Sequence, residues 1–334
     1  MDRVKPPKLR PGGKVRVVAP ASSMRGLSDA AVARGIRNLE TLGLKVEICP
    51  QATRDHMGLA GTPEERAEAL TEAFTDPAVD AVMCAWGGWN SNDLLPHLDL
   101  DAIRESPKPF IGYSDVTVLN SFLLGSAGLV NFQGPAFVTF THEFLMPWEV
   151  ECFRKVVMVG ETPVRLQPSP TYVDDPFYYM HPEEDVVEKG NPGWRTMRAG
   201  VARGILRGGH PESLLTLSGT EYWPDFEGSL LFLEVDEAGG PSLRVLRGLR
   251  HLEQLGVFDE VRGVLLGRTP EAAGLTLGLG LPELAMMVLG DRDVPVVAGM
   301  DFGHTNPIMT LPVGVEAEVD AGKKALTLLE PGVT

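Results

Sequence analysis

The N-terminal part of the chain alternates short apolar segments with amphipathic ones, and this alternation restricts the possible folds more than any other feature. The apolar segments have the length and composition of strands, and they lie at residues 14–20, 45–50, 80–86 and 109–113. Strands separated by helix-length segments are joined through crossovers and pair in parallel. The pattern therefore predicts an α/β domain whose mostly parallel sheet is covered by helices on both faces.

The segments between these strands carry residues that start and stop helices. Ser28 can cap a helix over 29–42, and Gly43 stands where the chain would leave it. Residues 62–65 have the order of a capping box with proline in the first turn, which predicts a second helix. A third helix is predicted over 116–124. These signals support the alternation of strand and helix.

The middle of the chain is less regular. Residues 146–198 are rich in aromatic, proline and acidic residues, and a helix is predicted near 148–159. We expect the weakly structured residues 160–197 to form a substrate loop or lid, because plain linkers rarely carry so many aromatic side chains.

The C-terminal part returns to regular structure. Buried strands are predicted at 229–235 and 261–267, with a helix over 242–255 between them and a hairpin of alternating residues at the end. The predicted units are an N-terminal α/β domain over 1–145, a linker and substrate loop over 146–198, and a C-terminal domain over 199–334.

Charge and composition exclude several classes of function. The formal net charge is −15, and such a surface repels phosphate backbones, so no nucleic-acid partner is expected. There is no apolar run of membrane-spanning length and no signal-peptide core, so we expect a cytoplasmic protein without a membrane partner. Cys49, Cys84 and Cys152 are odd in number and widely spaced, so neither a disulfide framework nor a metal site is expected.

A serine follows the strand at 109–113 directly, and a helix is predicted directly after it. This strand–turn–helix order raises a nucleophile out of a sheet, which makes Ser114 a candidate nucleophile. It also places the backbone N–H of Asp115 at a helix N-terminus, where it can stabilise negative charge. The sequence departs from G-x-S-x-G, so a role for Ser114 as an ordinary helix cap is the alternative.

Paired glycines, Gly87 and Gly88, follow the buried strand at 80–86. Their backbone can approach a ligand closely, and their N–H groups could complete an oxyanion hole with Asp115. The alternative is a tight turn that needs positive φ; a phosphate loop is excluded because no Gly-Lys-Ser/Thr follows. Cys84 lies inside the same strand and is expected to be buried and inert rather than a rival nucleophile.

A histidine and a glutamate have positions suited to such a site. His304 lies in a loop after a predicted strand, as a general base can, and His210, after a second glycine pair, is the competing histidine. Glu234 ends an apolar strand, where a histidine ring could satisfy its carboxylate and be oriented by it. Asp236 or Glu237 could take the same role.

These segments together resemble one family, the LD-carboxypeptidases and microcin C immunity peptidases, which are serine hydrolases. The similarity covers nearly the whole chain. GYSD at 112–115 resembles the nucleophile segment of the family, FLEVDE at 232–237 its glutamate segment and GHTNP at 303–307 its histidine segment. Their order along the chain makes the resemblance specific.

The resemblance implies a catalytic triad of Ser114, His304 and Glu234. It also implies a flavodoxin-like N-terminal parallel-sheet domain and a smaller C-terminal α/β domain, with the active site between them, in a homodimer. No metal or organic cofactor is expected, because a hydroxyl, an imidazole and a carboxylate suffice for acyl transfer.

Residues near the glycine pair distinguish the branches of the family. Asn90 and Asn92 stand where murein-recycling LD-carboxypeptidases tend to carry an arginine, and they resemble the microcin-immunity branch. Trp194, in GNPGW, resembles the substrate loop of that branch and would stack on a nucleobase, unless it packs to pin the loop. His210 stands where the family often has asparagine. With Gly87, these residues are the expected substrate contacts.

The expected activity is hydrolysis of an amide-type bond through an acyl-enzyme. The expected substrate is a peptidyl- or aminoacyl-nucleotide, as in microcin C detoxification. Removal of the terminal D-alanine of a murein tetrapeptide is the alternative. A two-lobed protein that binds a ligand without turnover is an alternative of another class.

Overall fold

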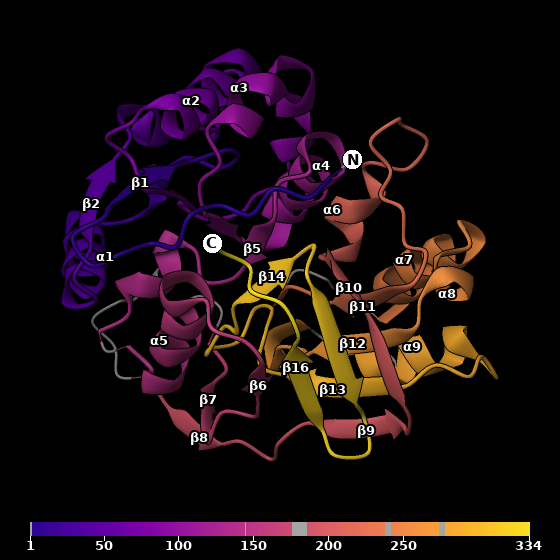
Figure 1. The fold of residues 1–334 in the computed structure, drawn as a ribbon. Helices are drawn as coiled ribbons and strands as arrows, with labels where there is room; N and C mark the ends of the chain where they lie inside the picture. Colours follow the sequence, from indigo (N-terminus) through magenta and orange to yellow (C-terminus); the bar gives the residue numbers. More distant parts are fainter. Residues whose placement is uncertain (1, 144, 176–185, 238–241, 274–277) are drawn as a thin grey trace.

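Two β-sheets stand side by side in the protein, one built mainly from the N-terminal part of the chain and one from the C-terminal part (Figure 1). The computed structural model describes residues 2–143, 145–175, 186–237, 242–273 and 278–334. In these ranges the first sheet has six strands and is largely parallel, and the second has eight strands of mixed direction. The predicted fold class, two α/β domains, is confirmed.

The N-terminal sheet has the strand order β14-β5-β4-β3-β1-β2. Its strands are β1 (Lys14–Val18), β2 (Lys45–Ile48), β3 (Ala81–Cys84), β4 (Phe110–Gly112), β5 (Asn131–Gln133) and β14 (Leu311–Val313). Strands β1 to β5 pair in parallel, and β14 runs antiparallel to β5. The four predicted strands are present, while β5 and β14 were not apparent from the sequence.

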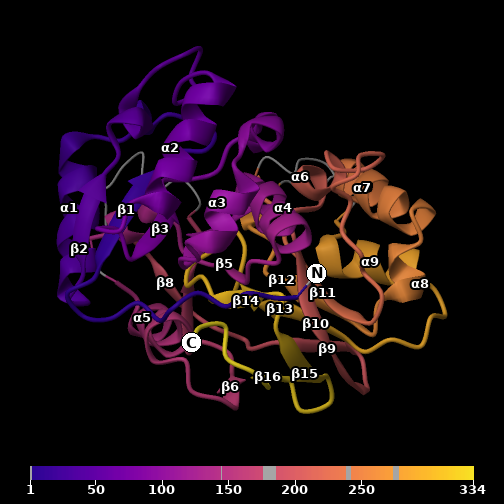
Figure 2. The same cartoon turned by 45° about the horizontal axis from the view of Figure 1, so that its top comes forward.

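Helices lie on both faces of this sheet (Figure 2). They are α1 (Asp29–Thr41), α2 (Pro63–Thr75), α3 (Leu100–Glu105) and α4 (Thr117–Ala127). Because successive strand residues point to opposite faces, Met83 joins the core beneath α1 and Cys84 joins the core beneath the other three helices. The Ser28 cap and the capping box of Thr62 and Glu65 are both present, as predicted.

The C-terminal sheet has the order β6-β16-β15-β10-β11-β12-β13-β9. Its strands are β6 (Val164–Leu166), β9 (Arg195–Arg198), β10 (Val201–Gly209), β11 (Ser229–Leu233), β12 (Gly263–Gly267), β13 (Val296–Met300), β15 (Glu316–Asp320) and β16 (Ala325–Leu328). Strands β10 to β13 are parallel, and the predicted terminal hairpin is the antiparallel pair β15–β16. Among the described residues, the α-helices that accompany this sheet are α6 (Pro211–Leu215), α7 (Ser242–Gln254), α8 (Val257–Glu260) and α9 (Leu281–Leu289).

The segment expected to be a linker and substrate loop takes part in the second domain. Helix α5 (Pro147–Phe153) passes into a π-helical stretch at Arg154–Val159, and β6 and β9 then pair at opposite edges of the C-terminal sheet. Between them β7 (Thr171–Val173) and β8 (Glu188–Gly190) form an antiparallel pair. Residues 176–185 of the expected lid lie outside the described residues, so the lid stays a prediction, as do the domain boundaries.

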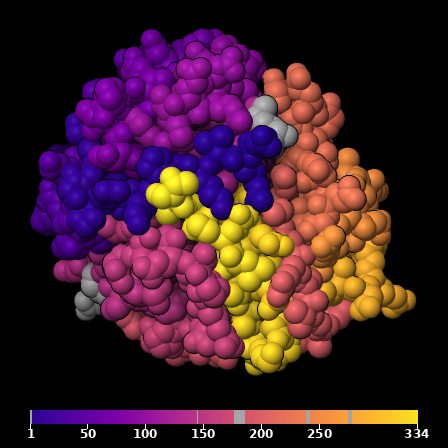
Figure 3. Space-filling view, in the orientation of Figure 1, coloured from indigo at the N-terminus to yellow at the C-terminus, as the bar shows by residue number. Residues whose placement is uncertain are grey.

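The chain passes from one domain to the other more than once, because β14 of the first sheet lies in sequence between β13 and β15 of the second sheet. The C-terminal residues (yellow) lie against the N-terminal residues (indigo) in Figure 3, and the N–H of Lys8 donates to the carbonyl of Thr334. At the domain junction a Cβ on Gly209 would lie 2.2 Å from the hydroxyl of Thr117, so only glycine fits there. In the described parts of the chain, no helix combines the length and apolarity needed to cross a bilayer.

Candidate active site

Ser114 stands on a sharp turn between β4 and α4. Its φ of 63° lies in the left-handed region, which costs a non-glycine residue about 1–3 kcal/mol and is typical of functional turns. The cap position of α4 belongs to Val116, and no side chain makes a cap hydrogen bond there, so the alternative that Ser114 is an ordinary helix cap is wrong. A Cβ on Gly87 would lie 2.9 Å from Ser114 Oγ, so the glycine strand end leaves room for the serine.

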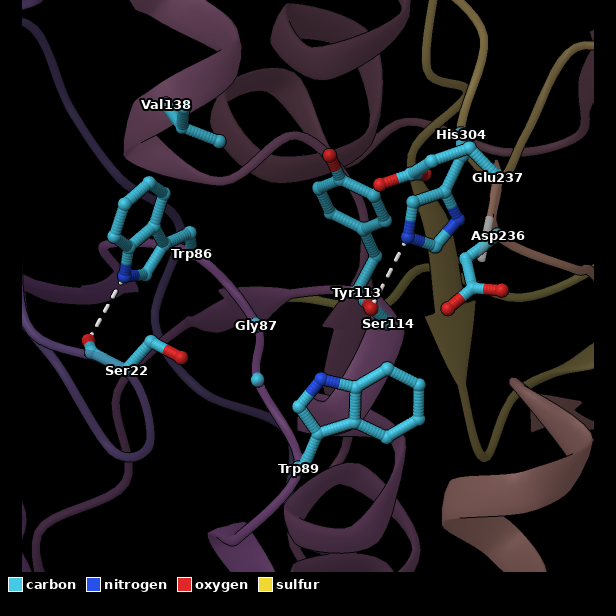
Figure 4. Close-up of a pocket in the computed structure, with 11 residues that line it drawn as sticks. Ser22, Trp86, Gly87, Trp89, Tyr113, Ser114, Val138, Asp236, Glu237 and His304 are labelled. Atoms are coloured by element: carbon cyan, nitrogen blue, oxygen red, sulfur yellow. Dashed lines mark hydrogen bonds between the residues drawn. The ribbon is translucent and has the colours of Figure 1, made fainter. Parts of the chain in front are cut away.

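A chain of hydrogen bonds joins Ser114 to His304 and Glu234 (Figure 4). His304 Nε2 lies 3.1 Å from Ser114 Oγ, and His304 Nδ1 lies 2.8 Å from Glu234 Oε2. The histidine is placed by the loop after β13, and the glutamate by the end of β11. Glu234 is fully buried, and when the ring is neutral its carboxylate favours the tautomer with Nδ1 protonated and Nε2 facing the serine.

Three carboxylates set the charge of His304. Burial by itself lowers the pKa of this ring, but Glu234, Glu237 and Asp236 outweigh it and raise the pKa to about 9. At neutral pH the free protein therefore holds His304 mainly as imidazolium. The raised pKa therefore favours the imidazolium that His304 becomes when it accepts a proton as a general base.

Asp115 fixes the glycine loop against the serine turn. Its buried carboxylate accepts the backbone N–H groups of Asn90 and Ser91 at 2.9 Å each, and the hydroxyl of Ser213 donates to it at 3.3 Å. From the sequence Asp115 was expected to contribute only its backbone N–H, and this role of the carboxylate was missed. Gly88 has a φ of 154°, and a Cβ there would lie 2.7 Å from Ser22 Oγ.

A pocket of about 270 Å³ opens above Ser114 (Figure 4). Its walls are formed by Ser22, Trp86, Gly87, Gly88, Trp89, Tyr113, Ser114, Val138, Asp236, Glu237 and His304. Trp86 and Ser22 lie on one side, and the two acidic residues lie on the His304 side. Among the described residues, no group of three or more histidine, cysteine, aspartate or glutamate side chains is arranged to hold a metal ion.

The expected role of Trp194 in stacking is wrong for this structure. Its side chain is 1% exposed, and its indole Nε1 donates to Asp301 at 2.7 Å. The same carboxylate pairs with Arg268 at 2.7 Å, so the indole is one donor in a buried polar cluster. Trp194 therefore packs in the C-terminal domain, which was the alternative.

Three other expected substrate contacts do not line the pocket. Asn90 and Asn92 lie beyond its wall, where the Asn90 backbone binds Asp115. His210 is buried behind the pocket, with Nε2 3.8 Å from Asp236 and its ring centroid 6.1 Å from that of His304. Only Gly87, of the five expected contacts, lies in the wall.

Trp89 is a pocket residue that sequence reasoning missed. It is 54% exposed, and the guanidinium of Arg244 packs over its ring at 5.3 Å from the centroid. In the sequence, its position directly after the glycine pair was the signal that could have indicated a place in the pocket. Asp236 and Glu237, considered as substitutes for Glu234, line the pocket instead. Cys84 is buried as expected, and burial raises the pKa of its thiol well above the ordinary value.

Comparison with known proteins places the whole chain in one family. Residues 15–134 match the N-terminal domain of LD-carboxypeptidases, and residues 203–319 match the C-terminal domain of the same family. The putative carboxypeptidase YocD of Bacillus subtilis is 33% identical over 94% of this chain and 95% of its own length. The microcin C7 self-immunity protein MccF of Escherichia coli is 30% identical over 89% of this chain and 87% of its own.

Solved structures give the same result. An MccF-like protein from Bacillus anthracis superimposes with a TM-score of 0.90 at 33% identity, covering 97% of this chain and 99% of its own. MccF in complex with glutamyl sulfamoyl guanosine superimposes with a TM-score of 0.89 at 26% identity, covering 99% of both chains. The chain therefore belongs to the LD-carboxypeptidase family, the S66 family of serine peptidases.

Proposed function

We propose that this carboxypeptidase-family protein is a serine hydrolase that uses Ser114, His304 and Glu234 to cleave an amide-type bond. The observation that carries the proposal is the continuous hydrogen-bond chain from the serine hydroxyl through the imidazole to a buried carboxylate. The serine also lies at the base of a pocket large enough for part of a small substrate. Hydroxyl, imidazole and carboxylate in this order are the parts that acyl transfer requires.

In the proposed reaction Ser114 Oγ attacks the carbonyl carbon while His304 Nε2 takes the serine proton. The backbone N–H groups of Asp115 and Gly88 stabilise the oxyanion, and the loss of one such donor typically lowers the rate by about 10²–10³. His304 then gives its proton to the leaving nitrogen, which departs and leaves an acyl-serine. Water, deprotonated by the same ring, releases the acid and restores Ser114.

The proposed substrate is a peptidyl- or aminoacyl-nucleotide. Support comes from related proteins, since MccF has been solved with aspartyl sulfamoyl adenosine and an MccF mutant with adenosine monophosphate. In this chain, Trp89 at the pocket mouth offers an exposed indole face for a nucleobase, in place of the buried Trp194. Stacking of a base on an aromatic side chain contributes about 1–3 kcal/mol.

A murein tetrapeptide is the second candidate substrate. A probable murein peptide carboxypeptidase of Bacillus subtilis is 28% identical over 99% of this chain. However, the terminal carboxylate of such a peptide would enter a pocket whose wall carries Asp236 and Glu237 and has no lysine or arginine among its lining residues. Like charges disfavour that complex. A nucleotide phosphate is anionic too, so the preference for the nucleotide substrate rests on the ligands of the related MccF structures.

The test is turnover of both substrates by purified protein and by Ser114→Ala. We expect release of the amino acid from an aminoacyl sulfamoyl adenosine, and a loss of at least about 10³-fold in the variant. Ser126→Ala, which removes a hydroxyl from the other end of α4, is the matched control and should keep full activity. Undiminished turnover by Ser114→Ala would refute the mechanism, and cleavage of only the murein peptide would refute the substrate. Tight binding of both without turnover would indicate a binding protein.

A further inference from the structure

Two acidic side chains form the His304 side of the pocket, and each carries an oxygen without a hydrogen-bond donor. Asp236 is only 6% exposed, and its Oδ1 has no hydrogen-bond partner within the described residues. Glu237 Oε2 is also buried, and it too has no hydrogen-bond partner within the described residues. Buried carboxylate oxygens without donors are costly, and both residues line the pocket, so a bound ligand is a possible source of the missing donor.

The charge on Asp236 is retained in spite of its burial. Burial by itself raises the pKa of this carboxyl, but the neighbouring His210 outweighs burial and holds the pKa below its ordinary value. His210 Nε2 stands 3.8 Å away, too far for a hydrogen bond to satisfy the oxygen. On its other side the ring meets Ser213 Oγ at 3.4 Å, and Ser213 donates to Asp115. The carboxylate is therefore ionised, and the ring beside it contacts the scaffold that positions Ser114.

In the described part of the pocket, the positive groups near these two acids already have partners. Among its lining residues there is no lysine or arginine, and His304 is committed to Ser114 and Glu234. Arg244 is the guanidinium near this wall, and it pairs with Glu212 and packs on Trp89. A positive donor group for the two unpartnered oxygens can therefore come from the substrate.

We propose that Asp236 and Glu237 bind the free ammonium group of the substrate's acyl part, so that the protein selects aminoacyl compounds with an unblocked amine. This inference rests on the proposed function, because it places the ammonium beside the carbonyl that Ser114 attacks. In an α-aminoacyl group the nitrogen lies two bonds from that carbonyl carbon, about 2.5 Å away. A carbonyl held over Ser114 thus brings the ammonium to the wall where the two acids stand.

The same ammonium would act on the general base. The titratable groups that face His304 are Glu234, Asp236, Glu237, His210 and Tyr113. A positive charge between Asp236 and Glu237 offsets two of the three carboxylates that hold the imidazolium. Binding of the correct substrate would therefore release the proton from His304 and produce the neutral base that the reaction needs.

The test uses two compounds that differ only in the amine: alanyl sulfamoyl adenosine and propionyl sulfamoyl adenosine. We expect the wild-type protein to prefer the alanyl compound in kcat/KM by about 10- to 150-fold, the range of a charge-assisted hydrogen bond. In Asp236→Asn/Glu237→Gln this preference should fall to within about 3-fold. The control Glu260→Gln removes one charge from the exposed end of α8 and should keep the preference.

A second readout separates charge recognition from a structural effect. With the alanyl compound the midpoint of the kcat–pH profile should lie below that of kcat/KM, because the bound ammonium lowers the pKa of His304; with the propionyl compound the midpoints should coincide. If the double variant does not fold, Glu237→Gln alone should reduce the preference at least about 3-fold.

Equal turnover of the two compounds by the wild type, or an unchanged preference in the folded variants, would overturn the inference while leaving the proposed hydrolase intact. If neither compound is cleaved, the proposed function fails instead. The inference is then decided by calorimetric binding of both compounds to Ser114→Ala: a preference for the alanyl compound supports it, and equal affinity overturns it.

Discussion

Replacing Glu234 with glutamine removes a negative charge from beside His304 and leaves the size of the side chain almost unchanged. Burial by itself lowers the pKa of this histidine, but the surrounding carboxylates, Glu234 foremost, raise it to about 9. Relative to an ordinary value of about 6.5, this corresponds to about 3 kcal/mol in favour of the imidazolium form. The substitution should remove the largest part of that preference.

The expected result is a change in both the midpoint and the height of the pH profile. Only the neutral ring can accept the Ser114 proton, so wild-type kcat/KM should rise with pH up to about 9. In Glu234→Gln the midpoint should move down, because burial, which lowers this pKa, is then opposed only by Glu237 and Asp236. The plateau should fall by about 10²–10⁴, because the imidazolium formed in the transition state loses its partner.

The assay is the initial rate at substrate concentrations well below KM across the pH range in which the protein stays folded, with circular dichroism as the check on folding. Glu260→Gln, on the exposed end of α8, is the matched control and should reproduce the wild-type midpoint. A midpoint that does not move in Glu234→Gln would show that the observed ionisation is not that of His304, and the assignment of the base would be refuted.

Four further results are expected. Trp89→Ala should raise KM for a nucleotide substrate by about 5- to 150-fold through lost stacking, measured by steady-state kinetics; an unchanged KM would exclude the indole from the site. Trp194→Phe should lower the free energy of unfolding by about 1–3 kcal/mol, because Asp301 loses a hydrogen-bond donor, and should leave KM unchanged. Urea denaturation measures the first effect, and steady-state kinetics on the same sample measures the second. Burial raises the pKa of Glu149 to about 8, so the folded protein binds a proton there that the unfolded chain releases above about 4.5. The stability that this proton contributes is complete below about 4.5 and is lost as pH rises through 8. Above that pH Glu149→Gln should therefore have a higher urea midpoint than the wild type. Identical pH dependences of the two urea midpoints would contradict this. The homodimer implied by family membership should appear in light scattering as twice the chain mass of 36.1 kDa, and a monomer at micromolar concentration would exclude it.

The meeting of Glu234 and His304 could be anticipated from sequence because each lies just after a strand, at the end of β11 and in the loop after β13. Strands β11 and β13 are parallel members of one sheet, so their carboxyl ends meet at one edge. Ser114 follows β4 of the other sheet, so its contact with His304, 190 positions away, depends on the packing of the two domains. The sharp turn at Ser114 was visible as strand, serine and helix without an intervening loop. What the residues do in catalysis is a separate question that the proposed variants address.

The fate of Trp194 could not be predicted from sequence. Local composition placed it in a loop rich in aromatic and proline residues, which is equally typical of binding loops and packed segments. Its burial depends on Asp301, which lies 107 positions away and whose carboxylate the indole binds. For the same reason Trp89 was overlooked, since exposure at a pocket mouth depends on the domain across the pocket rather than on its neighbours in sequence.

Strands β9 and β14 were missed because short strands that pair with distant segments carry little local signal. Strand β14 pairs with β5, although nearly the whole C-terminal domain separates them in sequence. This arrangement has a consequence for biosynthesis. The N-terminal sheet keeps an open edge at β5 while the rest of the chain leaves the ribosome, and open edges attract foreign strands. The domain begun first is thus sealed last, and a nascent chain stopped before residue 311 would be prone to self-association.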